Sequence, residues 1–369
     1  MQARVIFDVQ ELYYLAQYLP VYRELKQRGI HSKFAIYKNR DFNDLLRDTV
    51  AAEDLPVYWV RNQRDALAFY LKEKADWVVF GNHFFDIDAL HTVSKSAQFG
   101  HGVGPKMSYY TKSRTLMTVR FVEGQRRYDI LKQMYPDGNF VLTGFAKLDP
   151  LFNREIPPFD IVRAGLDPSK TTLLYAPTFY PSSLECFPDQ WPKQFDAYNL
   201  VVKPHFFSLA KAKYANQRKK LRKWASAPNV YVAQMSEHSL LPFMAASDVL
   251  ISEASSALFE FAAFDKPIVW CDFYKLRWTY RGPLRYRFTR RMDQDIKNYA
   301  HLGAHVSRYR ELKAVVDRSV SDPDAYAENR SEITQALVGA TDGKASCRIA
   351  DYLTGEMADN PNFQQKGWE

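Results

Sequence analysis

The sequence predicts an α/β protein with two parallel sheets covered by helices. Short apolar runs alternate with longer amphipathic segments along its 369 residues, and this β-α-β rhythm implies parallel strands. The alternation of strands and helices ends and begins again around residues 153–158, a stretch that contains two prolines. The length also corresponds to about two domains of roughly 150 residues each. We therefore expect two α/β halves of similar size that face each other.

The first half opens with a buried strand and an amphipathic helix that stops at Gly29. The apolar stripe of this helix consists of Leu15, Tyr18, Leu19, Tyr22 and Leu25. Strands are expected at residues 4–8, 31–37, 57–60 and 77–80, and helices at residues 12–28 and 64–74. The series ends near residues 140–144, and we assign residues 1–155 to this domain.

The second half repeats the pattern over residues 156–345. Strands are expected at residues 172–175, 200–203, 230–233, 248–251 and 268–270, and helices at residues 209–225 and 255–264. Residues 346–369 are assigned to a C-terminal tail, whose last, polar part we expect to be loose.

The composition narrows the class of protein. Hydrophobic residues make up 46%, charged residues 25% and aromatic residues 15% of the chain, which excludes disorder, collagen and a coiled coil as the dominant state. The net charge of +8 suits anionic ligands such as phosphates, nucleic acid or an acidic lipid surface. Three scattered cysteines are too few for a disulfide framework or a zinc site, and no apolar run is long enough to span a membrane. We expect a cytoplasmic protein.

The most informative segment is residues 247–256, where a strand runs directly into a helix. Backbone N–H groups at such a junction point outward, and the hydroxyls of Ser255 and Ser256 can add donors to a phosphate site. The alternative is a plain serine N-cap.

A second candidate is the glycine-rich segment at residues 100–106. His101 lies among glycines that offer no bulk to bury it, so its imidazole is free to face a cleft and to accept a proton from a hydroxyl. Lys106 could attract a phosphate nearby. The alternative is a histidine in an ordinary turn.

Two further basic residues, Lys203 and His205, follow the strand at residues 200–203. Ligands of open α/β sheets collect at the carboxyl ends of strands, so both are candidate phosphate contacts. A surface histidine with satisfied hydrogen bonds is the competing interpretation.

Residues 277–291 hold six arginines interleaved with aromatic residues, among them Trp278 and Tyr286. Such a run could contact a polyanionic acceptor or the anionic face of a membrane. A solvated loop whose arginines pair locally is the alternative.

Together these segments resemble the CDP-glycerol glycerophosphotransferase family, which makes teichoic-acid-like polymers. Matching segments occur in the family's order at residues 100–106 (WHGxxxK), 143–149 (TGxPRxD), 175–178 (YAPTW), 247–267 (aDxLITDYSSxxFDFaxxxKP) and 280–282 (the later RG). The sequence departs from the pattern at Gly100 (Trp in the family), Glu253 (Asp) and Ala254 (Tyr), and Lys203-Pro-His205 stands where the family has Arg-x-His-Pro. These departures leave open whether the donor carries glycerol, ribitol or another activated polyol or sugar.

The resemblance implies a GT-B architecture, in which two Rossmann-like domains, acceptor-side and then nucleotide-donor, face each other across an interdomain cleft that holds the active site. By resemblance, His101 and His205 are catalytic, and the donor is bound by Thr178, Lys203, Glu253, Ser255 and Ser256. Further cleft candidates are Lys106, Lys147, Asp149 and Arg281. No metal or cofactor is expected.

The function implied is transfer of glycerol phosphate, or a related polyol phosphate, from a CDP-activated donor to an acceptor hydroxyl, with release of CMP. The expected partners are that donor, a lipid-linked or saccharide acceptor and the anionic inner face of the cell membrane, but not nucleic acid. One alternative is a GT-B glycosyltransferase or epimerase that uses a nucleotide sugar. A non-enzymatic alternative is a basic protein that binds membranes or nucleic acid through its arginine run.

Overall fold

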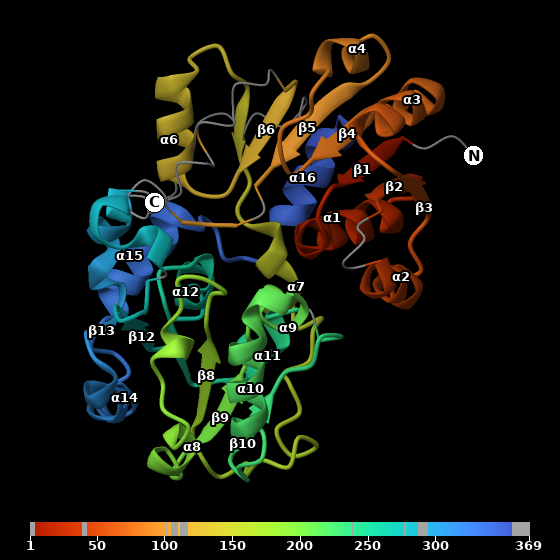
Figure 1. Ribbon diagram of the computed structural model, residues 1–369. Coiled ribbons are helices and arrows are strands. Elements are labelled where there is room, and N and C mark those ends of the chain that lie inside the picture. Colours follow the sequence, from red (N-terminus) through yellow and green to blue (C-terminus); the bar gives the residue numbers. More distant parts are fainter. Residues whose placement is uncertain are drawn as a thin grey trace. The chain divides into compact units, whose positions relative to one another are not determined.

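Two parallel sheets organise the chain, one in each of two compact units. The computed structural model describes residues 4–38, 43–100, 102–104, 110, 117–237, 239–276, 278–286 and 294–355 (Figure 1). Every strand pair in both sheets is parallel, as the β-α-β rhythm predicts.

The first unit contains a seven-stranded sheet in the order β3-β2-β1-β4-β5-β6-β7. Its strands are β1 (Val5–Val9), β2 (Ser32–Tyr37), β3 (Val57–Val60), β4 (Trp77–Phe80), β5 (Lys95–Phe99), β6 (Val119–Val122) and β7 (Phe140–Leu142). Its helices are α1 (Leu15–Gln27), α2 (Asn43–Ala52), α3 (Gln63–Glu73), α4 (Ile87–His91), α6 (Gln125–Met134), α7 (Asp149–Phe152) and α16 (Ala345–Thr354). Short 3-10 turns are η1 (Leu12–Tyr14) and η3 (Ala146–Leu148).

Helix α1 confirms the predicted apolar stripe. Its five stripe residues are all buried against the sheet, where Tyr18 and Tyr22 contact the rings of Phe7 and Phe34. The helix begins three residues later than predicted, because η1 forms the first turn.

The second unit contains a six-stranded sheet in the order β10-β9-β8-β11-β12-β13. Its strands are β8 (Thr172–Ala176), β9 (Asn199–Val202), β10 (Val230–Val232), β11 (Val249–Ser252), β12 (Ile268–Cys271) and β13 (Ala304–Val306). Its helices are α8 (Trp191–Gln194), α9 (Phe206–Ala210), α10 (Ala215–Trp224), α11 (Leu241–Ala246), α12 (Ser256–Ala262), α14 (Leu312–Ser321) and α15 (Ala327–Leu337). The 3-10 turns are η4 (Ser183–Glu185), η5 (Ala212–Tyr214), η6 (Trp278–Tyr280), η7 (Gly282–Leu284), η8 (Gln294–Leu302) and η9 (Tyr309–Glu311).

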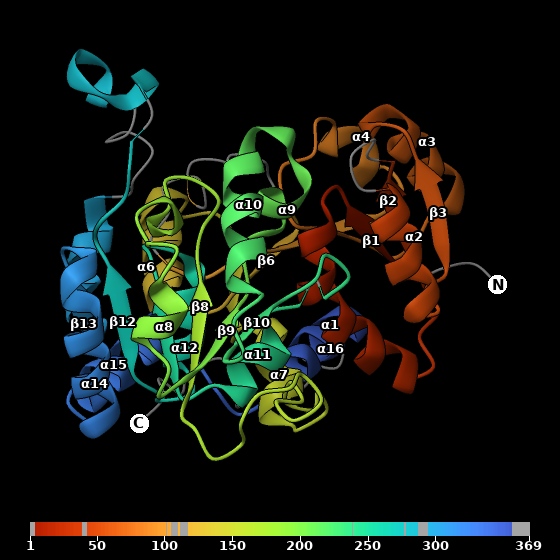
Figure 2. The same ribbon diagram turned by 60° about the horizontal axis from the view of Figure 1, so that its bottom comes forward.

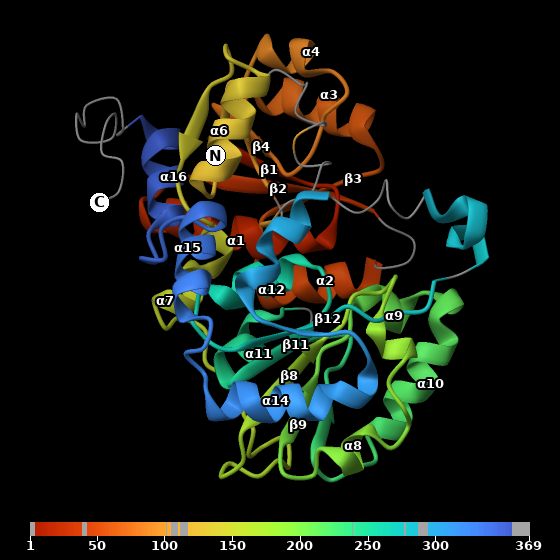
Figure 3. The ribbon, with the colours of Figure 1, turned by 90° about the vertical axis from the view of Figure 1, so that its left-hand side faces the viewer.

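Aromatic side chains fill the core of the second unit. Trp191 of α8 and Trp224 of α10 are fully buried and pack with Tyr175 of β8 on one face of the sheet. Figure 2 shows β8, β9 and β10 side by side. Helix α14 contacts β11, β12 and β13 and can be followed in Figure 3.

The helix expected at residues 209–225 is divided into α9, η5 and α10. Lys211 adopts an extended backbone between α9 and η5, which breaks the helix. Arg218 of α10 donates to the carbonyl oxygen of Lys211 at 2.7 Å, so an acceptor exposed by the break is satisfied.

The C-terminal segment differs most from the expectation. The chain leaves the second unit after Val338 and rejoins the first from Gly339, so the second domain ends earlier than residue 345. Residues 346–354, expected in a tail, belong to α16 (Ala345–Thr354), which lies beside α1 (Figure 1). Helix α16 buries Ile349 and Leu353 in the core of the first unit. An amphipathic pattern indicates a buried face but does not say which sheet it covers.

Candidate active site

The chain changes direction within the second sheet between β8 and β11. From β8 it continues outward through β9 and β10, and β11 starts the opposite half on the other side of β8. Because β9, β8 and β11 are adjacent and parallel, their carboxyl ends meet at one edge, which is where open α/β sheets bind ligands. Six predicted residues follow these three strands: Thr178, Lys203, His205, Glu253, Ser255 and Ser256.

Glu253 directs its carboxylate into the protein. It is only 4% exposed. One oxygen accepts from the backbone N–H of Thr178 at 2.7 Å, and the other from the backbone N–H of Ser183 at 2.5 Å and the hydroxyl of Ser182 at 3.2 Å. Burial raises the pKa of this carboxyl, and the hydrogen bonds oppose the rise. Glu253 therefore fixes the loop that follows β8.

Thr178 is held by the same contact. Its N–H is used by Glu253, and its hydroxyl donates to the carbonyl oxygen of Pro181 at 2.5 Å. Thr178 thus uses its N–H for Glu253 and its hydroxyl for a bond within its own loop.

Lys203 is a buried cation at the end of β9. The residue is 8% exposed, and no residue that the structure describes forms a hydrogen bond or ion pair with its ammonium group. Burial lowers the pKa of Lys203 to about 8, while the charge of Glu237 acts in the opposite direction. A buried charge without a partner is costly, so a bound anion would stabilise it.

His205 stands at the start of α9, where its Nδ1 accepts from the backbone N–H of Phe207 at 3.2 Å. An accepting Nδ1 carries no proton, so the neutral ring carries its proton on Nε2 and offers a donor there. The ring centroids of Phe179 and Phe206 lie 4.7 and 4.8 Å from the centroid of the imidazole, and this packing fixes the orientation of His205.

Ser255 occupies the N-cap position of α12, but its side chain does not cap the helix. Its Oγ lies 3.3 Å from the Oγ of Ser252, which can donate to the carbonyl oxygen of Ala176 at 2.7 Å. Ser256 is the first residue of α12. The structure therefore favours neither serine as a side-chain cap.

The glycine-rich segment reaches α12 within the second unit. Gly104 has a φ of +100°, and a Cβ at this position would lie 2.6 Å from the ring of Phe259. Gly104 thus packs closely on the helix that begins at Ser256. His101 and Lys106 lie outside the described residues.

The other described candidates lie elsewhere. Lys147 is half-buried in η3 of the first unit. Asp149, also in the first unit, is 3% exposed and accepts from the backbone N–H of Ser346 at 2.6 Å and that of Ala345 at 3.2 Å. Its carboxylate therefore holds the start of α16. Arg281 is exposed in the second unit and donates to the carbonyl oxygen of Leu276 at 2.5 Å.

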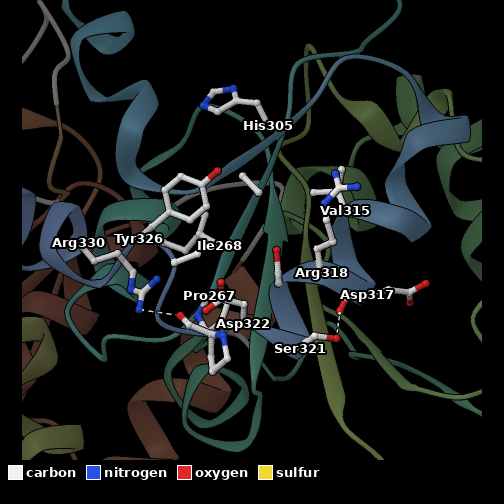
Figure 4. A pocket seen from close by; sticks show the side chains of 14 residues that line it. Pro267, Ile268, His305, Val315, Asp317, Arg318, Ser321, Asp322, Tyr326 and Arg330 are labelled. Carbon is white, nitrogen blue, oxygen red and sulfur yellow. Dashed lines mark hydrogen bonds between the residues drawn. The ribbon is translucent and has the colours of Figure 1, made fainter.

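A pocket of about 570 Å³ lies at the amino ends of β12 and β13, between them and the α14–α15 connection (Figure 4). Arg318, Tyr326 and Arg330 are among its lining residues. None of the predicted site residues lines it. Within the described ranges, no three His, Cys, Asp or Glu side chains are grouped so that they could hold a metal ion.

Sequence reasoning missed the partners of Glu253. Ser182 and Ser183 are fully buried and bind its carboxylate. The serine pair shortly after residues 175–178 was the available signal, but serines in a loop are common and carry no specific pattern.

Solved structures share this fold across nearly the whole chain. The wall teichoic acid polymerase TagF is 16% identical with a TM-score of 0.64, over 96% of this chain and 89% of that chain. A putative UDP-N-acetylglucosamine 2-epimerase from Listeria monocytogenes is 11% identical with a TM-score of 0.64, over 99% of this chain and all of the other. These likenesses confirm the predicted α/β fold of the GT-B type.

No curated protein sequence matches the chain. The family model for CDP-glycerol:poly(glycerophosphate) glycerophosphotransferases matches residues 58–355. The match covers most of the chain and includes all the segments that carried the resemblance. The chain therefore belongs to the CDP-glycerol:poly(glycerophosphate) glycerophosphotransferase family.

Proposed function

We propose that residues at the carboxyl ends of β8, β9 and β11 bind the donor in the reaction of this family. Family membership makes the chain a transferase that moves glycerol phosphate from CDP-glycerol. The observation that carries the assignment of the donor site is Lys203, a lysine that is only 8% exposed and whose ammonium group has no ion-pair partner among the described residues. A diphosphate supplies the negative charge that this position lacks.

In the proposed reaction, an acceptor hydroxyl oxygen attacks the β-phosphorus of CDP-glycerol. The bond from this phosphorus to the bridging oxygen breaks, and CMP leaves with the electron pair of that bond. His101 accepts the hydroxyl proton as general base. The new bond joins glycerol phosphate to the acceptor as a phosphodiester.

Positioning and charge stabilisation are the main demands of phosphoryl transfer. Lys203, the Nε2–H of His205 and the hydroxyls of Ser255 and Ser256 are proposed to stabilise the charge on the departing CMP and on the transferred phosphoryl group. Glu253 is a positioning residue, because its oxygens accept hydrogen bonds from Thr178, Ser182 and Ser183.

The acceptor is proposed to be lipid-linked and to be reached at an anionic membrane surface. No helix in the described part of the chain is long and apolar enough to cross a bilayer. Trp278 is 83% exposed and Tyr286 is 49% exposed, and Arg281 and Arg285 lie between them. Exposed aromatic rings beside arginines suit the headgroup region of an anionic bilayer.

The donor assignment is tested by incubating the purified protein with CDP-glycerol, CDP-ribitol and UDP-N-acetylglucosamine and measuring nucleotide release. We expect CMP release from CDP-glycerol that depends on an acceptor. His101→Ala is expected to lower kcat by about 10²-fold or more while CMP still binds. Conversion of UDP-N-acetylglucosamine without any CMP release would instead support a nucleotide-sugar epimerase.

A further inference from the structure

The start of the glycine-rich segment is held by a buried arginine of the next β-α unit. Strands β5 and β6 are parallel neighbours, with Phe99 opposite Phe121, so the chain leaves both strands at the same edge of the sheet, at Gly100 and at Glu123. Arg127 lies in the first turn of α6 and is only 6% exposed. Its Nη2 lies 2.8 Å from Oε1 of Glu123 and donates to the carbonyl oxygen of Gly102 at 3.1 Å.

The absence of a side chain at Gly100 makes room for the guanidinium group of Arg127. A Cβ at residue 100 would lie 2.5 Å from Nη1 of Arg127, closer than any real contact. The guanidinium group therefore occupies the volume that a side chain at residue 100 would need. One arginine thus packs against Gly100 and hydrogen-bonds to Gly102, the two residues that flank His101.

Glu123 and Arg127 form a buried ion pair. Glu123 is 5% exposed, and its burial raises the pKa of the carboxyl while the charge of Arg127 opposes the rise. Removing one partner of such a buried pair leaves the other charge uncompensated, which holds the two together.

Tyr110, which follows the glycine-rich segment in the sequence, contacts α6 and the residue after it. The hydroxyl of Tyr110 accepts from Arg126 at 2.7 Å, and its carbonyl oxygen accepts from the hydroxyl of Tyr135 at 3.3 Å. Tyr110 is 4% exposed. Gly102 and Tyr110 therefore both contact residues of α6 or Tyr135, which directly follows it.

We infer that Arg127, held by Glu123, is a positioning residue that sets the place of the segment carrying His101. The inference rests on the proposed function, in which His101 is the general base. A base acts only within hydrogen-bond reach of its proton, and a misplacement of about 1 Å costs about 10²-fold in rate. The contacts of Arg127 with Gly100 and Gly102 restrict the positions of the two residues that flank His101.

The test compares Arg127→Lys with Arg28→Lys. Lysine keeps the charge but lacks the planar guanidinium group, whose Nη2 contacts Glu123 and Gly102 while its Nη1 packs against Gly100. Arg28 is the matched control, because it pairs with Glu24 at 2.8 Å and Asp351 at 2.6 Å in the same unit but touches neither glycine. We expect Arg127→Lys to lower kcat at least about 10-fold, with CMP affinity unchanged, and Arg28→Lys to leave kcat unchanged.

A mutant cycle tests the contact itself. Gly100→Ala should lower kcat in the wild-type background but not in Arg127→Ala, where the space is free. Equal effects of Gly100→Ala in both backgrounds would overturn the inference, as would a normal kcat for Arg127→Lys or an equal loss in Arg28→Lys.

Amide exchange separates this inference from the proposed function. Exchange at residues 102–104 should be faster in Arg127→Lys than in the wild type or Arg28→Lys, whatever reaction the protein catalyses. Faster exchange without CMP release from the wild type would contradict the proposed function alone. Unchanged exchange in an active enzyme would contradict the role of Arg127 alone.

Discussion

The carboxylate of Glu253 accepts hydrogen bonds from both the backbone N–H and the hydroxyl of Ser183, each at 2.5 Å. Seventy residues separate the two in sequence. The pair ties the loop after β8 to the end of β11, at the edge where the donor is proposed to bind.

Glu253→Gln should therefore destabilise the protein and weaken CMP binding. The amide group presents donors toward an N–H of Thr178 or Ser183, and a buried donor left without an acceptor costs about 1–3 kcal/mol. Urea unfolding measures the free energy, and calorimetry measures CMP affinity. Glu185→Gln, a half-buried neighbour, serves as the control. Wild-type stability in Glu253→Gln would show that the carboxylate of Glu253 does not stabilise the loop after β8.

Donor affinity should fall as the pH rises above about 8, because Lys203 loses its proton there. A bound diphosphate raises the pKa of Lys203, so binding takes up a proton at pH values between the free and bound pKa. The dissociation constant for CDP-glycerol should then increase by up to about tenfold per pH unit. Lys203→Met should bind weakly and lose this dependence, while Lys219→Met on the exposed side of α10 should retain it. An unchanged pH profile in Lys203→Met would remove Lys203 from the donor site.

Replacing Ser255 and Ser256 together with alanine should weaken CMP binding about 30-fold, since two hydrogen bonds of about 1 kcal/mol each are lost. Stability should change by less than about 0.5 kcal/mol, because the side chain of Ser255 does not cap α12. Calorimetry on CMP and thermal unfolding give the two readouts. Lower stability with unchanged CMP affinity would mean that the serines serve only the helix.

Asp8 should make stability depend on pH. Burial raises the pKa of Asp8 to about 6, against the hydrogen bonds from Tyr70 and Tyr37. A raised pKa means that the folded state binds the proton more tightly, so the contribution of this group is full below about pH 4 and is lost as the pH rises through about 6. The loss is on the order of 3 kcal/mol.

Asp8→Asn should accordingly raise the Tm at pH 8 relative to the wild type, and much less so at pH 4. Asp48→Asn, at an exposed position of α2, should show no such difference between the two pH values. An equal change in Tm at both pH values would show that Asp8 does not titrate in this range.

The exposed aromatic and arginine residues after β12 should bind anionic vesicles. Each arginine near such a surface contributes about 1 kcal/mol, which salt screens. The triple variant Trp278→Ala, Arg281→Gln, Arg285→Gln should sediment less with phosphatidylglycerol vesicles and still bind CMP. The control variant Arg308→Gln, Arg310→Gln removes two exposed charges elsewhere in the unit, and we expect it to sediment with the vesicles like the wild type. Loss of CMP affinity in the triple variant would assign these residues to donor binding instead.

Much of the proposed donor site can be located from the sequence, because its residues lie next to strand ends in sequence. A strand pattern locates its own carboxyl end, so Lys203, His205 and Ser255 could be assigned to a ligand edge without a structure. Glu253 and Asp149 were predicted from resemblance as site residues, and the direction of their carboxylates was not available from the sequence. Glu253 binds the loop after β8, and Asp149 binds the start of α16.

The α/β class, the two parallel sheets, most strands of each half and the family can be predicted from the amino-acid sequence, because they depend on local periodicity and short motifs. Three features needed the folded structure: the return of α16 to the first sheet, the burial of Lys203 without a described partner, and the contact of Arg127 with Gly100 and Gly102. Each of these joins residues that are distant in sequence or depends on what surrounds a side chain. A local pattern fixes which face of an element is apolar, but packing of the whole chain decides what that face, or a charge beside it, meets.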